Sequence, residues 1–117
     1  MALGIKELIE GIDGRILTSG VDIDDIKIED GYVSDLLSDV MGNAKSNQAW
    51  ITIMKHLNSV AVASLAGIPC VIFAKGVQPE KEVIQKGEEE RVLLVTSELS
   101  SFEICGKLYC LLNDKNK

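Results

Sequence analysis

The pattern of apolar and polar positions is clearest in the middle of the chain, at residues 49–77. Residues 49–54 and 70–74 are short, almost continuous apolar runs rich in β-branched side chains. Such runs are typical of strands buried on both faces, and a crossover helix allows two of them to lie parallel. Residues 58–67 between them are small and largely apolar. The pattern therefore predicts a right-handed strand–helix–strand unit, with the helix buried on almost every side.

The remaining segments alternate between the period of a helix and the period of a strand. Helical spacing of apolar residues predicts four further helices, over residues 3–12, 34–41, 79–90 and 100–112. Alternation or short apolar runs predict strands at residues 14–18, 26–32 and 92–95. Asn58 is at the expected position of the N-cap of the central helix. Gly67 is where the helix is expected to end, with a residue in the left-handed conformation. Ser100 and Glu103 match a capping box at the start of the final helix.

This order of elements predicts an α/β fold: a single three-layer domain, a mixed sheet of about five strands with the parallel unit at its centre, and helices on both faces. The length of 117 residues fits one domain over residues 1–117 and is sufficient for a conventional core. Residues 26–32 are expected nearer a sheet edge than the central pair. Asp30 falls on the apolar side of their alternation.

Composition narrows the classes of partner. Twelve Lys and Arg against eighteen Asp and Glu give a net charge of −6, which argues against nucleic acid and against anionic membrane surfaces. Residues 57–74 carry no charge, but a Gly-Ile-Pro break within them indicates a buried helix and strand rather than a membrane span. Three cysteines without a C-x-x-C pair, and no visible export signal, predict a reducing cytoplasm.

Motifs for cofactors and metals are incomplete. Residues 42–46 contain a Lys-Ser pair but lack the first glycine of a phosphate-binding loop, and they precede a strand. Gly11, Gly14 and Gly20 do not have the spacing of a dinucleotide fingerprint. His56 is the only histidine, and no spacing of carboxylates or cysteines completes a metal site around it. The sequence therefore predicts no cofactor, no metal site and no catalytic residue.

Polar residues at the carboxyl ends of the two central strands form the candidate ligand site. Ligands of open α/β sheets bind outside these ends, where helix N-termini also point. The sequence leaves open whether Lys55 and Lys75 flank one anion-sized pocket or are solvated, and whether His56 contacts a ligand. It also leaves open whether Thr52 lines the floor of a pocket or bonds its hydroxyl to the backbone. The candidate residues are Thr52, Lys55, His56, Asn58, Lys75 and Gly76.

A second candidate surface is the helix over residues 34–41, whose apolar face is large for so short an element. Trp50 opens a central strand after a polar loop, and the sequence leaves open whether it belongs to the core or to a subunit contact. We therefore expect a homodimer. The interface candidates are Leu37, Val40, Met41 and Trp50.

Four segments carry a resemblance to a known family: Asp-Leu-Leu-Ser-Asp-Val-Met at 35–41, Ala-Trp-Ile-Thr-Ile-Met at 49–54, Ala-Val-Ala-Ser-Leu at 61–65 and Ser-Glu-Leu-Ser-Ser-Phe-Glu at 97–103. The chain resembles, over nearly its whole length, a stand-alone member of the DRTGG-domain family. That family is similar in fold to the N-terminal domain of HPr kinase/phosphorylase. The resemblance implies an α/β domain without the catalytic part of the kinase.

The chain departs from the motif that names this family. Lys55-His56 stands where Asp-Arg would follow the first central strand, and Ala74-Lys75-Gly76 stands where Thr-Gly-Gly would follow the second. Only Gly76 therefore matches the motif, and any role that these residues have in relatives does not carry over to the other positions.

The resemblance also implies a functional setting. Relatives attached to phosphate-acetyl transferases or to nucleotide-sensing CBS domains imply a regulatory or dimerising role, and stand-alone relatives imply a redox or signalling setting. We therefore predict a non-enzymatic, homodimeric, cytoplasmic module for regulation or protein interaction, with a small anionic or nucleotide-like ligand. Two alternatives stay open: a small phosphoryl- or acyl-transfer enzyme using Lys55 and His56, and an obligate subunit of a redox or signalling complex.

Overall fold

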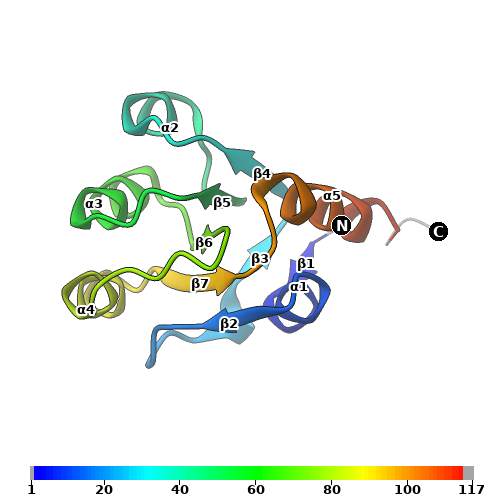
Figure 1. Cartoon of the computed structure of the whole chain (residues 1–117), viewed down its shortest axis with the longest axis horizontal. Coiled ribbons are helices and arrows are strands. Elements are labelled where there is room, and N and C mark those ends of the chain that lie inside the picture. The colour runs from blue at the N-terminus through cyan, green and yellow to red at the C-terminus, as the bar shows by residue number, and fades with distance from the viewer. Residues whose placement is uncertain (1, 115–117) are drawn as a thin grey trace.

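The computed structural model describes residues 2–114, which form a five-stranded mixed sheet between two layers of helices (Figure 1). The strands lie in the order β2 (Gly14–Ile16), β7 (Leu93–Ser97), β6 (Cys70–Phe73), β5 (Gln48–Thr52) and β4 (Asp30–Val33). Only β2 runs antiparallel to its neighbour. A separate antiparallel pair joins β1 (Leu3–Gly4) to β3 (Lys27–Ile28).

Helices cover both faces of the main sheet (Figure 1). One layer consists of α2 (Leu37–Asn43), α3 (Leu57–Ala66) and α4 (Lys81–Glu90). The other consists of α1 (Ile5–Gly11) and α5 (Ser101–Asp114), and a 3-10 turn at Ile23–Asp25 precedes β3. This architecture confirms the predicted α/β class, with a mixed sheet of five strands.

The central unit has the predicted arrangement. Strands β5 and β6 pair in parallel, from Ala49 opposite Cys70 to Thr52 opposite Phe73. Every residue of both strands is buried, which explains their nearly continuous apolar sequence. Helix α3 connects them and ends at Gly67, whose φ of 74° is the left-handed conformation expected of a helix-terminating glycine.

Successive side chains of the central strands point to opposite faces of the sheet, so the domain has two cores, one on each face. Ile51 and Ile72 pack toward α1 and α5, whereas Trp50, Val71 and Phe73 pack toward α2, α3 and α4. These side chains are almost completely buried. Each such large apolar side chain contributes about 1.5–3 kcal/mol by leaving water.

Two of the interface expectations need correction, because the side chains lie inside the domain. Val40 and Trp50 have no exposed surface and belong to the core between the sheet and the helices α2–α4. Leu37 is partly buried against the same core, and Met41 is exposed. Trp50 is therefore a core residue, and of the four candidates Met41 offers the most surface to a partner.

Helix α3 is also less buried than its composition predicts. Ser59, Val60 and Ala63 face the core, but Leu57 and Leu65 are 48% and 75% exposed. The helix is the middle member of an outer layer, so one side of it faces solvent. The N-cap of α3 is His56 rather than Asn58, because the helix begins at Leu57, earlier than predicted.

Several other predicted elements have different bounds, among them the helix predicted at 34–41, which is α2 at Leu37–Asn43. Residues 26–32 form two strands: β3 pairs with β1, and β4 pairs with β5. The first helix starts at Ile5, because Leu3 and Gly4 form β1. Helix α4 starts at Lys81, so Pro79 lies before its first turn. The capping box is confirmed: the Ser100 amide donates to Glu103, and the Glu103 amide donates to Ser100 Oγ.

Candidate functional site

A hollow of about 370 Å³ lies at the carboxyl ends of β5 and β6, where α3 and α4 begin. The chain leaves β5 at Thr52 and enters α3 at Leu57, and it leaves β6 at Phe73 and enters α4 at Lys81. Because the two strands are parallel neighbours, both connections emerge at the same edge of the sheet. The hollow is lined by Lys55, His56, Leu57, Asn58, Glu80, Glu82 and Val83.

The N-termini of two ten-residue helices meet at this hollow. The caps of α3 and α4, His56 and Glu80, have extended backbones, and neither side chain accepts a hydrogen bond from its own helix. The first amides of a helix have no partner within the helix and carry partial positive charge. Such helix ends favour anionic groups, so an anionic group can bind in the hollow at the N-terminus of α3 or at that of α4.

The side chains around the hollow carry both signs of charge. Lys55 and His56 come from the β5–α3 connection, while Glu80 and Glu82 come from the start of α4. A lysine and helix amides bind phosphate or carboxylate oxygens, whereas carboxylates accept hydrogen bonds from hydroxyl or amino groups. The hollow therefore has the chemistry for a ligand with an anionic part and a hydroxyl-bearing part.

The structure brings three of the six predicted ligand residues together. Lys55, His56 and Asn58 line the hollow, and the other three do not. The buried hydroxyl of Thr52 donates to Asp35 Oδ1 at 2.7 Å and accepts from the Met54 amide at 3.1 Å. Thr52 therefore fixes the end of β5 and is not among the residues that line the hollow.

Lys75 and Gly76 form a tight turn against the loop after β7. Their amides donate to the carbonyls of Leu99 and Ser97, both at 2.8 Å, and both residues have positive φ. A Cβ on Gly76 would lie 2.6 Å from Glu98 Oε2, so this turn is closely packed. Lys75 therefore does not join Lys55 among the residues that line the hollow, whereas Glu80 and Glu82 do.

Three charged residues that line or support the hollow are absent from the predicted site. Glu80 and Glu82 fall within the predicted helix 79–90, and they line the same hollow as Lys55 because α3 and α4 are neighbours. Asp35 falls within the predicted helix 34–41 but lies before α2, and its carboxylate accepts from the Ile53 amide at 2.9 Å. No local sequence signal identifies a contact between residues so far apart.

Groups for covalent or metal chemistry are poorly placed within the part of the chain that the structure describes. Burial raises the pKa of the Cys70 thiol to about 12, so it is not a nucleophile at neutral pH. The imidazole of His56 has no hydrogen bond among residues 2–114 that would orient it as a base. The same residues contain no cluster of three potential metal ligands and no helix long and apolar enough to span a membrane.

The chain belongs to the family described as HPr Serine kinase N terminus, whose model matches residues 44–112. A solved structure of similar fold contains the CBS and DRTGG domains of the regulatory region of Clostridium perfringens pyrophosphatase, complexed with the activator diadenosine tetraphosphate. The TM-score is 0.72 at 12% identity, over 89% of this chain and 46% of that one. The likeness shows the DRTGG-type fold, and the chain spans less than half of that structure. No curated protein matches the sequence.

Proposed function

We propose that this domain is a non-catalytic regulatory module that binds a nucleotide-like ligand in the hollow at the ends of β5 and β6. The observation that carries the proposal is the meeting of two helix N-termini beside Lys55, with Glu80 and Glu82 among the lining residues. Phosphates suit the helix ends and the lysine, and ribose hydroxyls suit the carboxylates. The activator complex of the related regulatory region supports this class, although that binding belongs to the region as a whole.

We expect Lys55→Ala to weaken binding of the best nucleotide at least about tenfold, because a charge-assisted hydrogen bond contributes about 1.5–3 kcal/mol. The probes are ATP, AMP, diadenosine tetraphosphate and glucose 6-phosphate, measured first by thermal shift and then by isothermal calorimetry. Glu82→Gln should weaken the nucleotides more than inorganic phosphate, since phosphate has no hydroxyl-bearing sugar.

The matched control is Lys45→Ala, because Lys45 is exposed and precedes β5 at the opposite edge of the sheet. It should bind as the wild type does. The proposal fails if none of the probes binds, or if the Lys45 and Lys55 variants lose affinity equally. Turnover of any probe that disappears in His56→Ala would instead favour a phosphoryl- or acyl-transfer enzyme.

The proposed module is homodimeric through the outer face of α2 and α3. Met41, Leu57 and Leu65 are exposed apolar side chains on these neighbouring helices, with Leu65 exposed by 75%. Burying such side chains against a second copy removes apolar surface from water. The alternative partner for the same face is a protein of a redox or signalling system, in which case this chain would be an obligate subunit of that complex.

Leu65→Glu is expected to convert the dimer into a monomer in sedimentation velocity, because it places a charge in the apolar contact. Phe102→Glu is the control, since Phe102 is 87% exposed on α5, across the sheet from α3. A wild-type chain that is monomeric at every concentration tested contradicts the dimer. A variant at Leu65 that still dimerises contradicts this face.

A further inference from the structure

Strand β4 lies at the edge of the main sheet, with β5 on one side only. The amide of Glu29, immediately before it, donates to the carbonyl of Asn47 beside β5. Because successive residues of a strand point their amides in opposite directions, those of Asp30 and Tyr32 point away from β5. An edge of this kind offers backbone groups that can pair with another strand.

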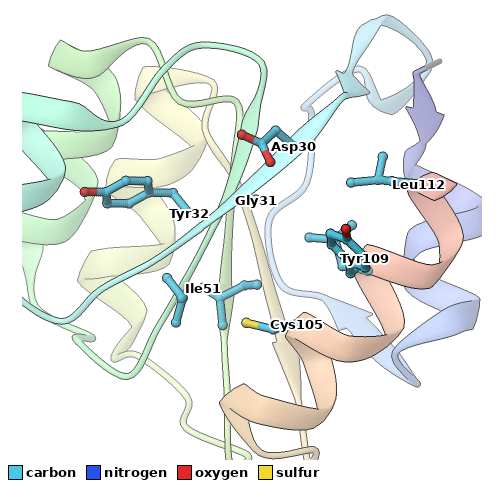
Figure 2. A pocket seen from close by; sticks show the side chains of 9 residues that line it. Asp30, Gly31, Tyr32, Ile51, Cys105, Tyr109 and Leu112 are labelled. Atoms are coloured by element: carbon cyan, nitrogen blue, oxygen red, sulfur yellow. The ribbon is translucent and has the colours of Figure 1, made fainter.

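An apolar pocket of about 190 Å³ lies beside this edge, between β4 and α5 (Figure 2). Cys105 and Tyr109 of α5 lie on one side of it, and Ile51 lies on the side of the sheet, whereas Tyr32 points away from α5 (Figure 2). Gly31 belongs to its lining, and a Cβ there would lie 2.9 Å from Leu108 Cδ2. The glycine therefore allows α5 to pack close to the edge strand.

The mouth of the pocket is open to solvent at two apolar side chains. Val33 is 57% exposed and Tyr109 is 71% exposed, and both line the pocket. An apolar cavity of about 150 Å³ is enough for a benzene ring. The pocket therefore has room for one aromatic or branched side chain that approaches along β4.

The charge along β4 and the segment that follows it is mostly negative. Residues 28–44 contain four carboxylates, at Glu29, Asp30, Asp35 and Asp39, and the nearest lysines along the chain are Lys27 and Lys45, which flank this stretch. Pairing of this edge with its own copy would therefore bring carboxylates together, which is unfavourable. A strand flanked by basic residues would be attracted to the same edge.

We infer that β4 and the pocket beside it form a docking site for an extended, basic-flanked segment of another protein. The segment adds a strand to the outer edge of β4, places one apolar side chain between Val33 and Tyr109, and directs Lys or Arg toward the carboxylates at the strand ends. Strand addition supplies affinity through backbone hydrogen bonds, and the pocket supplies specificity. The site lies away from the ligand hollow and does not depend on it.

The test uses two capped synthetic peptides, Lys-Thr-Phe-Thr-Lys and Glu-Thr-Phe-Thr-Glu, titrated into the ¹⁵N-labelled full chain. We expect the basic peptide to shift amide signals of residues 29–34 and 105–112 and to bind at least tenfold tighter than the acidic one. Absence of shifts at millimolar peptide overturns the inference. Shifts centred on another surface, or equal binding of both peptides, overturn it as well.

Two variants at the mouth of the pocket test the site from opposite sides. Val33→Lys on β4 and Tyr109→Lys on α5 should each weaken the basic peptide at least tenfold, because each puts a positive charge beside the bound apolar side chain. Both positions are largely exposed, so the spectra of the free variants should remain those of a folded chain. Gln85→Lys, at an exposed position of α4 in the opposite helix layer, is the matched control and should bind normally. Unchanged binding by both mouth variants contradicts the docking site.

Discussion

Replacing Trp50 with alanine is expected to lower the free energy of unfolding by about 3–5 kcal/mol. The side chain has no exposed surface, and its indole N–H donates to the carbonyl of Ser34 at 2.8 Å. The substitution leaves a cavity beside Val60 and Val71 and removes the donor for a carbonyl next to β4. Because domains have a total stability of about 5–15 kcal/mol, the variant should be marginally folded. Urea denaturation followed by circular dichroism measures this, since Trp50 is the only tryptophan available for fluorescence.

Trp50→Phe is the control for this large effect. Phenylalanine keeps an aromatic ring in the core but cannot donate to Ser34, so we expect a loss of about 1–3 kcal/mol. If Trp50→Ala instead kept wild-type stability and changed only the oligomeric state, the residue would belong to a subunit contact and its place in the core would be wrong.

The parts of the fold that could be predicted are those set by local pattern. The continuous apolar runs at 49–54 and 70–74 correspond to β5 and β6, because strands buried on both faces have no polar positions. The capping box of Ser100 and Glu103 was also recognisable, since both of its hydrogen bonds join residues three apart. In such cases the residues that form the contact are the residues that carry the signal.

The parts that could not be predicted depend on contacts between distant segments. The alternation over residues 26–32 continues through Glu29, yet β3 pairs with β1 and β4 with β5. Asp30 looked misplaced on an apolar face, but its carboxylate accepts from Gln48 Nε2 at 2.8 Å on the neighbouring strand. Trp50 could equally suit a core or an interface until its strand was placed between β4 and β6. None of these partners is visible in the sequence around the residue.

The candidate site shows the same division. The position of Lys55, His56 and Asn58 beyond a strand end followed from the parallel unit, and these residues do line the hollow. Lys75 occupies the equivalent position after β6 but belongs to a left-handed turn that is hydrogen-bonded to the loop after β7. Backbone conformation in the connection, which the residue type alone does not specify, decides which lysine lines the hollow.

Removing the carboxylate of Asp35 is expected to destabilise the domain by about 1–3 kcal/mol and also to weaken binding in the hollow. One oxygen of this carboxylate accepts from the Thr52 hydroxyl and the Ile53 amide, where β5 ends and the connection to α3 begins. Lys55 and His56 follow directly along that connection. In Asp35→Ala the connection loses its anchor, so ligand affinity should fall together with the free energy of unfolding.

A double-mutant cycle with Thr52→Val distinguishes loss of the hydrogen bond between Asp35 and Thr52 from independent losses of stability at the two positions. Both single variants remove the same hydroxyl–carboxylate bond, so the loss in the double variant should be smaller than the sum of the single losses. Asp25→Ala, at an exposed carboxylate in the 3-10 turn, should change stability by less than about 0.5 kcal/mol. Strict additivity of the losses at Asp35 and Thr52 would show that the bond between them does not hold the β5–α3 connection. Unchanged ligand affinity in Asp35→Ala would show that the connection keeps its place without this anchor.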